Sequence, residues 1–491
     1  MALRLRGAAP TWRNDAGTVI LAIMIDPERL TALNHLSVRS GAAFVLYWMQ
    51  AAQRAGCNHA LWYAAAEADR LGLPLIVLFV LTDYPSATAP HYRWMLSGLR
   101  KTAATLRDAG IGFRLRRGEP LKTVLEVAES AALVVVDRAP ARWSISVKAA
   151  LAEQSGVAVI EVDGESVIPE AVASPKQEWS ARTLRLKIEG AVASYASRSL
   201  PPVPSPRRSA TRIQVPGDGL PGRTKPDEAA LFAAYDAAPG PAYPGDRSPE
   251  QAFPCVPGEA AGRTRLEAFV QDRLDRYDGD RNDPLKDGSS GLSPYLHFGQ
   301  VSPLAIISAA RAQGGPGYPA FAEQLVVRRE LCRNYVRYRP LDYDAWEGLP
   351  AWSRAALDSA VSDRRAYLYT RLQFEAATTH DPYWNAAQEQ LVRSGTIHNY
   401  MRMYWGKMIL AWSATPREAF ATALYLNDRY ALDGRDPNGW AGVAWCFGLH
   451  DRPWPARPVY STVRSMVAAG LRRKFDADAY ARAWAPGQNP S

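Results

Sequence analysis

A glycine- and serine-rich loop at Asp287–Gln300, DGSSGLSPYLHFGQ, has the residue types that bind phosphate groups. It presents hydroxyls at Ser289, Ser290 and Ser293. Proline suits the first turn of a helix, so Ser293-Pro294 predicts a helix start. Backbone amides at such a start, together with small residues and hydroxyls, can cradle a diphosphate. An ordinary capped turn has the same composition, and the loop alone does not separate the two interpretations.

The segment Asn399–Trp412, NYMRMYWGKMILAW, predicts a helix with one face rich in sulfur and indole groups. Its residues recur at three- and four-residue spacing and are Met401, Trp405, Met408 and Trp412. Such a stripe is typical of a helix packed into a core. Arg402 and Lys407 lie in the same helix, and an arginine beside aromatic residues can donate hydrogen bonds to a flavin or a carboxylate.

Two further stretches combine polar and aromatic residues. Tyr425–Gly448 places amides and carboxylates around glycines, ahead of two tryptophans: Asn427, Asp433, Asp436, Asn438, Trp440 and Trp445. These polar groups can hydrogen-bond the edge of a heterocycle or simply form Asx turns. His450–Phe475 interleaves basic residues with aromatic ones: Arg452, Arg457, Arg464, Arg472, Arg473 and Lys474 with Trp454, Tyr460 and Phe475. Nucleic-acid binding surfaces have this pattern, and so do solvated basic faces.

The first half of the chain alternates predicted strands and helices. Strands are expected at Phe44–Gln50, Pro74–Leu81, 112–118, Ala132–Asp137 and Val157–Asp163, and helices at Asn58–Gly72 and 91–110. This alternation predicts a doubly wound α/β domain with a parallel sheet. No GxGxxG follows the first strand, so the fingerprint of an ordinary dinucleotide-binding domain is absent.

A Pro- and Gly-rich stretch at 200–262 separates this half from a helical half, in which apolar residues recur with helical spacing. We therefore expect five parts. They are an N-terminal extension (1–37), an α/β domain (38–199), a surface linker (200–262), an all-α domain (263–480) and a tail (481–491).

Composition limits the possible functions. The chain has 491 residues, 47% of them hydrophobic, and a formal net charge of +9, which suits either a polyanionic partner or plain solubility. Its four cysteines form no CxxC pair, which argues against a zinc site and a disulfide framework. No apolar run approaches the roughly 18 residues of a membrane span. We expect a cytoplasmic protein.

Together these motifs resemble class II cyclobutane pyrimidine dimer (CPD) photolyases of the photolyase/cryptochrome family. The resemblance rests on LYWMQAAQRAGCNHAL, ARTLRLKI, RNDPLKDGSSGLSPYLHFGQVSPL, HDPYWNAAQ, YMRMYWGKMILAW, YLNDRYALDGRDPNGWAGVAWCFG and HDRPWPARPV. It implies an antenna-type α/β domain and a helical domain that holds a bent FAD, active as FADH⁻. It also implies a light-driven deoxyribodipyrimidine photo-lyase that splits pyrimidine dimers in DNA.

The resemblance implies roles for individual residues. The cofactor set is Tyr277, Ser289, Ser290, Gly291, Leu292, Ser293, Arg402, Asn427, Asp433 and Asp436. Within it, Arg402 and Asp433 would pair beside the isoalloxazine, and Asn427 would lie near flavin N5. Electrons would reach FAD through Trp405, Trp384 and Trp412. The flipped dimer or its DNA would meet Arg281, Asn282, Met403, Trp445, Arg452 and Arg464.

The implied partner is UV-damaged DNA, double- or single-stranded. A dimer inside a duplex cannot reach a buried flavin and must swing out, which costs less than flipping a normal base because a dimer stacks poorly. Phosphate contacts would make binding salt-sensitive and nearly independent of sequence. The resemblance further implies a monomer, an antenna pigment such as 8-hydroxy-5-deazaflavin, and, in a prokaryote, association with the nucleoid.

Three stretches depart from the family pattern. Asp137–Gln154, DRAPARWSISVKAALAEQ, replaces a Tyr-Leu-Arg-rich helix start, which bears on antenna binding. Gln324 stands where the family usually has glutamate at a position expected to touch the dimer; its amide can hydrogen-bond but offers no titratable proton. The linker and GTIHNYMRMYW also differ from the usual forms.

The main alternative is a cryptochrome-like FAD photoreceptor without repair activity. Gln324 favours the receptor, whereas Met403, Trp445 and Arg452 favour the enzyme. A cofactor-free nucleic-acid-binding protein and a light-independent flavin oxidoreductase are further alternatives, which a flavin spectrum and light-dependent turnover would separate.

Overall fold

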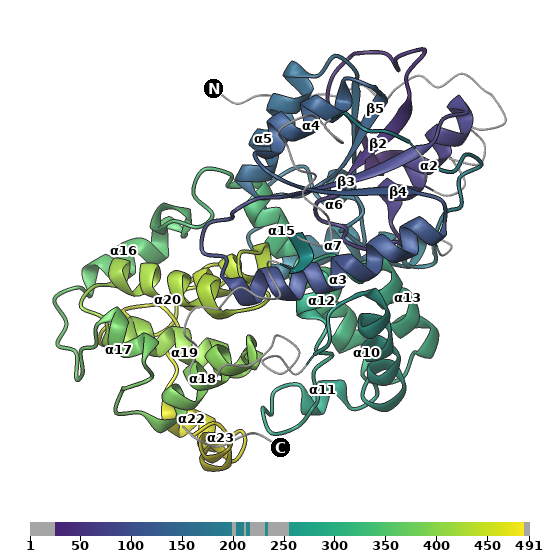
Figure 1. Cartoon of the computed structure of the whole chain (residues 1–491). Helices are drawn as coiled ribbons and strands as arrows, with labels where there is room; N and C mark the ends of the chain where they lie inside the picture. The colour runs from purple at the N-terminus through teal and green to yellow at the C-terminus, as the bar shows by residue number, and fades with distance from the viewer. Residues whose placement is uncertain (1–24, 199–202, 211–212, 217–230, 234–254, 486–491) are drawn as a thin grey trace.

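The computed structural model describes residues 25–198, 203–210, 213–216, 231–233 and 255–485. The expected N-terminal extension up to residue 24, most of the Pro- and Gly-rich stretch and residues 486–491 lie outside the described residues. An α/β domain and a helical domain lie against each other, with helix α3 (Ala89–Asp108) along their boundary (Figure 1). In that boundary Lys101 Nζ donates to the carbonyl of Pro257 (2.9 Å) and His91 Nε2 contacts the carbonyl of Ala431 (3.1 Å).

A six-stranded sheet in the order β1-β6-β5-β2-β3-β4 forms the centre of the α/β domain. Its strands are β1 (Leu30–Ala32), β2 (Phe44–Trp48), β3 (Leu75–Leu81), β4 (Gly112–Arg117), β5 (Ala131–Asp137) and β6 (Ala158–Val162). All pairings are parallel except that of β1 with β6. The predicted doubly wound α/β domain is confirmed. Strand β1 was not expected, since it lies in the stretch assigned to an N-terminal extension.

Local sequence explains these elements well. The other helices of the domain are α2 (His59–Leu71), α4 (Pro120–Ala128), α5 (Arg142–Gln154), α6 (Glu170–Ala173) and α7 (Ala181–Ala196). Asn58 caps α2 by accepting a hydrogen bond from the amide of Leu61, and Gly72 ends it in the left-handed conformation at φ 64°. Every residue of β3 is buried, as expected for a strand covered on both faces.

The second domain is helical, as predicted. Its helices are α10 (Glu259–Asp272), α11 (Tyr277–Asp280), α12 (Ser293–His297), α13 (Pro303–Gln313), α14 (Tyr318–Ala322), α15 (Arg329–Tyr338), α16 (Ala351–Ser359), α17 (Arg371–Glu375), α18 (Pro382–Ser394), α19 (Asn399–Trp412), α20 (Pro416–Tyr430), α21 (Pro437–Cys446), α22 (Ala468–Arg472) and α23 (Ala477–Ala483). Residues 320–338, whose apolar positions have helical spacing, are divided by a π-helical segment, η2 (Glu323–Arg328). Such segments occur often at functional sites.

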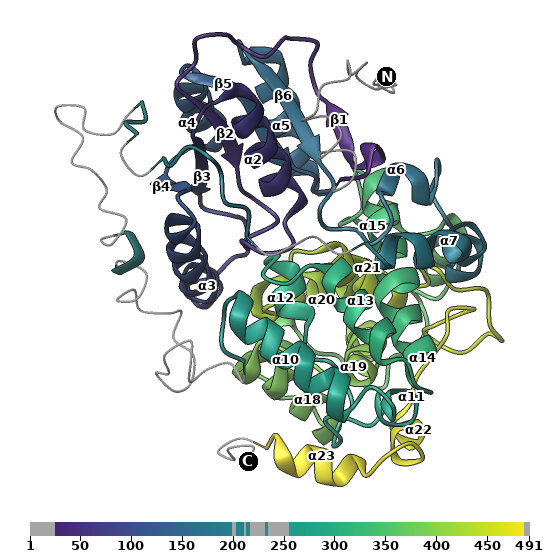
Figure 2. The ribbon, with the colours of Figure 1, turned by 90° about the vertical axis from the view of Figure 1, so that its right-hand side faces the viewer.

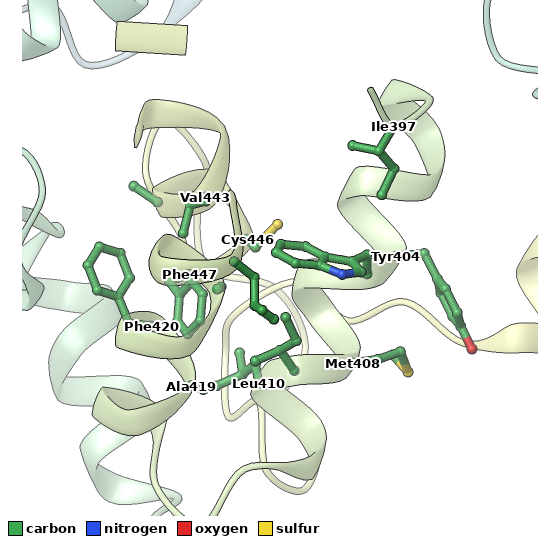
Figure 3. Packing of buried hydrophobic residues seen from close by; sticks show 14 of the residues in the cluster. Ile397, Tyr404, Met408, Leu410, Ala419, Phe420, Val443, Cys446 and Phe447 are labelled. Atoms are coloured by element: carbon green, nitrogen blue, oxygen red, sulfur yellow. The ribbon is translucent and has the colours of Figure 1, made fainter. Parts of the chain in front are cut away.

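Helices α19, α20 and α21 share one apolar core (Figure 3). Phe447, at the end of α21, packs edge-on against Phe420 of α20 at 5.3 Å between ring centroids. A Cβ on Gly406 would lie 2.6 Å from Cys446 Sγ, so α19 and α21 approach closely at that point. The predicted stripe of α19 is buried in this core. These contacts fix the relative positions of the polar residues that the three helices carry.

Buried charged residues also connect the two domains. Arg54 pairs with Glu165 at 2.6 Å, and Arg329 of α15 donates to the carbonyl of Glu165 at 2.8 Å. Glu330 accepts a hydrogen bond from the amide of Val167 at 2.7 Å, and burial raises the pKa of its carboxyl to about 7. Among the described helices, none has both the length and the apolarity needed to cross a membrane.

Candidate functional site

A cavity of about 280 Å³ with polar and apolar walls lies within the helical domain and is open to solvent on one side. Seven residues to which the family resemblance gives a role line it: Tyr277, Ser290, Leu292, Ser293, Gln324, Asp433 and Asp436. They come from segments that are far apart in the chain, so the fold brings six of the ten predicted cofactor residues to one cavity, together with Gln324. Other lining residues include His297, Arg329, Asn399 and Asn438.

The serine-rich loop forms one wall of the cavity and continues into α12, whose start at Ser293 is confirmed. Gly291 has φ +65°, and a Cβ there would lie 2.7 Å from the Arg265 guanidinium. Arg265 holds the loop by donating to the carbonyl of Ser290 at 2.9 Å. The loop therefore needs glycine at this position, where the chain turns tightly around an arginine. Ser289 is exposed and does not line the cavity.

Arg402 of α19 connects two of the predicted residues. Its guanidinium donates to Asn427 Oδ1 at 2.6 Å and to Asp433 Oδ1 at 3.2 Å. Asn427 is only 2% exposed, and its Nδ2 donates to Asp428 Oδ1 at 2.9 Å. Asn427 lies near the end of α20, ahead of the glycines in the Tyr425–Gly448 stretch. An arginine, a carboxylate and an amide thus form a connected polar group beside the cavity.

Asp436 has two functions in the local structure. As the N-cap of α21 it accepts a hydrogen bond from the amide of Asn438 at 2.9 Å, and its other oxygen is 3.5 Å from His297 Nδ1. Burial alone would raise the pKa of Asp436, but its hydrogen bond with His297 and the nearby cations outweigh burial and lower it to about 2. Asp436 is therefore a carboxylate at neutral pH, fixed at the edge of the cavity.

Segment η2 links the cavity to a second predicted region. Gln324 lines the cavity, while the guanidinium of Arg328 lies over the ring of Trp445, 5.1 Å from its centroid. Met403 belongs to the same region, because its carbonyl is 3.8 Å from Cys446 Sγ, next to Trp445. Both Met403 and Trp445 are half-buried. The residues expected to meet a flipped dimer are thus connected to the expected cofactor cavity through η2.

The three predicted tryptophans form a continuous chain. Trp405 and Trp384 stack at 6.4 Å between centroids with 4° between their planes, and Trp384 meets Trp412 at 6.5 Å and 66°. Trp384 Nε1 donates to the carbonyl of Trp405 at 3.0 Å, which fixes the stacked pair. All three indoles are buried. Beyond Trp412 lies His380, 4.8 Å away, which stacks on the exposed Tyr367.

The predicted DNA residues divide into two groups. Arg452 and Arg464 are exposed, and both lie over the ring of Trp454, at 5.7 and 4.6 Å. Arg281 belongs to a distant part of the sequence and lies over the ring of Tyr277 at 5.9 Å. Asn282 follows it and is half-buried. A cation over an aromatic ring gains about 0.5–1 kcal/mol at an exposed site, which favours these positions of the basic groups.

Sequence reasoning missed several residues of this site. Arg329 and His297 line the cavity without having been chosen. A reason to choose His297 was present in the sequence, since it lies inside the serine-rich motif Asp287–Gln300. Nothing in the sequence pointed to Arg329, because a charged residue in a helix is normally expected to face water. Its burial depends on a contact with Glu165 of the other domain.

Comparison with known proteins adds to this geometry. The model of the DNA photolyase family matches residues 45–207. The deoxyribodipyrimidine photo-lyase of Methanothermobacter thermautotrophicus is 41% identical over 468 residues, which cover 93% of this chain and 98% of that protein. The photo-lyase of the same name from Oryza sativa subsp. japonica is 40% identical, covering 89% of this chain and 86% of that protein.

Two solved structures share the fold. A class III photolyase from Agrobacterium tumefaciens has a TM-score of 0.69 and 21% identity, covering 91% of this chain and 87% of its own. A cryptochrome from Synechocystis has a TM-score of 0.70 and 16% identity, covering 91% of this chain and 89% of its own. At this level of identity the likeness concerns the fold alone.

Proposed function

Because the chain belongs to the DNA photolyase family, we propose that it is a deoxyribodipyrimidine photo-lyase, which splits cyclobutane pyrimidine dimers in UV-damaged DNA under blue or near-UV light. The observation that carries the proposal is a single cavity with predicted cofactor residues on its walls, joined through η2 to the half-buried Trp445. Relatives with that name are 37–41% identical over most of this chain.

The chemistry of the cavity walls fits FAD. Hydroxyls of Tyr277, Ser290 and Ser293, with the cation of Arg329, suit a diphosphate and a ribityl chain. The Arg402–Asp433 pair and the Asn427 amide suit the polar edge of a flavin ring. When bound in its reduced form, FAD would supply the electron that opens the cyclobutane ring after light absorption.

The chain's own residues position the reactants. Arg402 is held by two hydrogen bonds, so its charge stays fixed toward the expected flavin position. The stacked indoles of Trp405 and Trp384 provide a short path by which an electron leaves the protein interior or enters it. Trp445 offers an apolar wall to the flipped dimer, and Arg452 and Arg464 offer charge to phosphates.

The finer assignments rest on the resemblance and are part of this proposal. They are membership of class II, a bound antenna pigment such as 8-hydroxy-5-deazaflavin, a monomeric state and a cytoplasmic location. The absorption spectrum of the purified protein tests both pigments at once. A colourless protein that also fails to take up added FAD would refute the cofactor assignment.

Repair is tested with an oligonucleotide that carries one thymine dimer, incubated with FAD-loaded protein under blue light and in darkness. We expect dimers to disappear only in the light. Unchanged dimers in the light, with flavin present, would support the photoreceptor alternative that Gln324 favours. Loss of dimers in darkness would instead indicate a different reaction.

A further inference from the structure

Trp179 is a large apolar side chain with little protein around it. It is 67% exposed, whereas half of the tryptophans among the described residues are buried. It lies just before α7, between Glu178, which is buried, and Ser180, which caps the helix by accepting a hydrogen bond from the amide of Thr183. No motif chosen from the sequence assigned it a role.

The backbone around Trp179 is held firmly. The amide of Glu178 donates to Asn334 Oδ1 at 2.7 Å, and Asn334 Nδ2 donates to the carbonyl of Lys176 at 2.9 Å. Tyr338 donates to the carbonyl of Ser174 at 2.9 Å. Three hydrogen bonds from α15 thus fix the loop that carries the indole. A rigid backbone that presents an exposed tryptophan is typical of a binding contact, because little entropy is lost when the partner arrives.

Trp179 lies beside the region proposed to receive the lesion. Its carbonyl is 3.1 Å from His450 Nδ1, and His450 stands two residues before Arg452. His450 has φ 57°, which a non-glycine residue rarely adopts, and its ring packs edge-on against Tyr335 at 6.0 Å. In Figure 2 the segment that follows α21 runs next to α7.

A second connection leads from α7 to Trp445. Arg185 of α7 donates to both carboxylate oxygens of Glu323, from Nε at 3.0 Å and from Nη2 at 2.7 Å. Glu323 also accepts from Arg328 at 3.1 Å, and Arg328 lies over Trp445. Helix α7 and the loop before it are therefore connected to the region expected to meet the lesion, through His450 and through Glu323.

The charges in this area suit a polyanion. Lys176 and Arg182 are exposed three residues before and after Trp179, and Arg452 is exposed two residues after His450, which contacts the Trp179 carbonyl. The nearby carboxylates are engaged, Glu323 by two arginines and Glu178 by Lys187. An exposed indole among cations is the combination that binds single-stranded or unpaired bases, since each base has a face on which an aromatic ring can stack.

We propose that Trp179 is a base-stacking contact for DNA, with its indole covering an unpaired base beside the flipped dimer. The DNA surface then extends from the helical domain onto the loop before α7. The inference rests on the proposed function, because extrusion of a dimer is what leaves neighbouring bases with uncovered faces.

The test measures binding of FAD-loaded protein, in darkness, to a labelled duplex with one thymine dimer and to the same duplex without it. Trp179→Ala is expected to raise the Kd for the damaged duplex by about 5- to 150-fold, the loss of one stacked base. Its salt dependence should equal that of the wild type, because stacking displaces no counterions. Trp179→Phe should keep most of the affinity.

Leu186→Ala is the matched control, since Leu186 is 72% exposed on α7 and is expected to leave the Kd unchanged. A Trp179→Ala protein that binds the damaged duplex within about twofold of the wild type would overturn the stacking contact. So would a Trp179→Phe protein as weak as Trp179→Ala. If the wild type itself fails to prefer the damaged duplex, the proposed function falls, and this inference with it.

Discussion

Gly439 provides a sharp test of the polar group beside the cavity. It lies in α21, where alanine would ordinarily stabilise the helix by about 1 kcal/mol. A Cβ at this position, however, would lie 2.9 Å from Asn427 Nδ2 and 3.7 Å from the carbonyl of Asp433. Asn427 is 2% exposed and bonded through both ends of its amide, to Arg402 and to Asp428, so it cannot move aside without losing a hydrogen bond.

The same helix supplies the control. A Cβ on Gly442 would meet nothing within 4 Å. We expect Gly442→Ala to stabilise the protein by up to about 1 kcal/mol, from helix propensity alone. Gly439→Ala has the same favourable contribution from helix propensity, but overpacking costs about 1–3 kcal/mol of stability. Its free energy of unfolding should therefore fall by up to about 2 kcal/mol. The free energies of unfolding of the two variants should therefore differ by about 1–3 kcal/mol.

Thermal unfolding and FAD titration of both variants measure the effect. For a domain of this size, a difference of 1–3 kcal/mol corresponds to a separation in Tm of roughly 2–12 °C. Gly439→Ala should also bind FAD more weakly, because displacement of Asn427 moves the Arg402 guanidinium. If the two variants match in Tm and in FAD affinity, Asn427 is not held as the structure indicates, and the reasoning fails.

Four further predictions concern the electron path, the DNA contacts and the buried lysine. Trp405→Phe should slow photoreduction of oxidised FAD while leaving repair by chemically reduced protein almost intact; equal loss of both would contradict the indole chain. Arg452→Ala should lower the slope of the logarithm of the DNA-binding constant against the logarithm of salt concentration by about 1. An unchanged slope would show that this residue does not contact phosphate. Gln324→Glu should change kcat for repair more than the affinity for DNA, and an effect on affinity alone would argue against its expected contact with the dimer. Burial lowers the pKa of Lys407 from 10.5 to about 8. Between these values the unfolded chain binds more protons, so stability of the wild type should rise with pH by up to about 3 kcal/mol, and Lys407→Met, followed by urea unfolding, should lack that rise.

Much of the fold could be predicted because the signals were local. The apolar run of β3, the Asn58 cap and Gly72 terminus of α2, and the stripe of α19 each specify their element without reference to distant residues. Strand β1 was not predicted, because its three residues, Leu30–Ala32, are too few to show an alternation of apolar and polar side chains. Its pairing depends entirely on β6, more than a hundred positions later in the chain.

The candidate site was predictable where polar groups are unusual for their surroundings, as in the serine-rich loop and the Asp433–Asp436 region. It was not predictable where charge is buried between domains. Arg329 and Glu330 belong to α15, whose strongly segregated pattern suggests a charged face toward water. That face instead meets Glu165 and Val167 of the α/β domain, and only the packed domains could reveal it.

Segment η2 explains how one short stretch serves two regions. The amide of Arg329 donates to the carbonyl of Gln324, a five-residue closure that places residues i and i+5 one above the other. Gln324 and Arg329 consequently both face the cavity. In a regular α-helix Gln324 would align with Arg328 instead. The wider turn therefore releases Arg328 to cover Trp445, so that the expected cofactor and lesion positions are set by adjacent residues of a single helical segment.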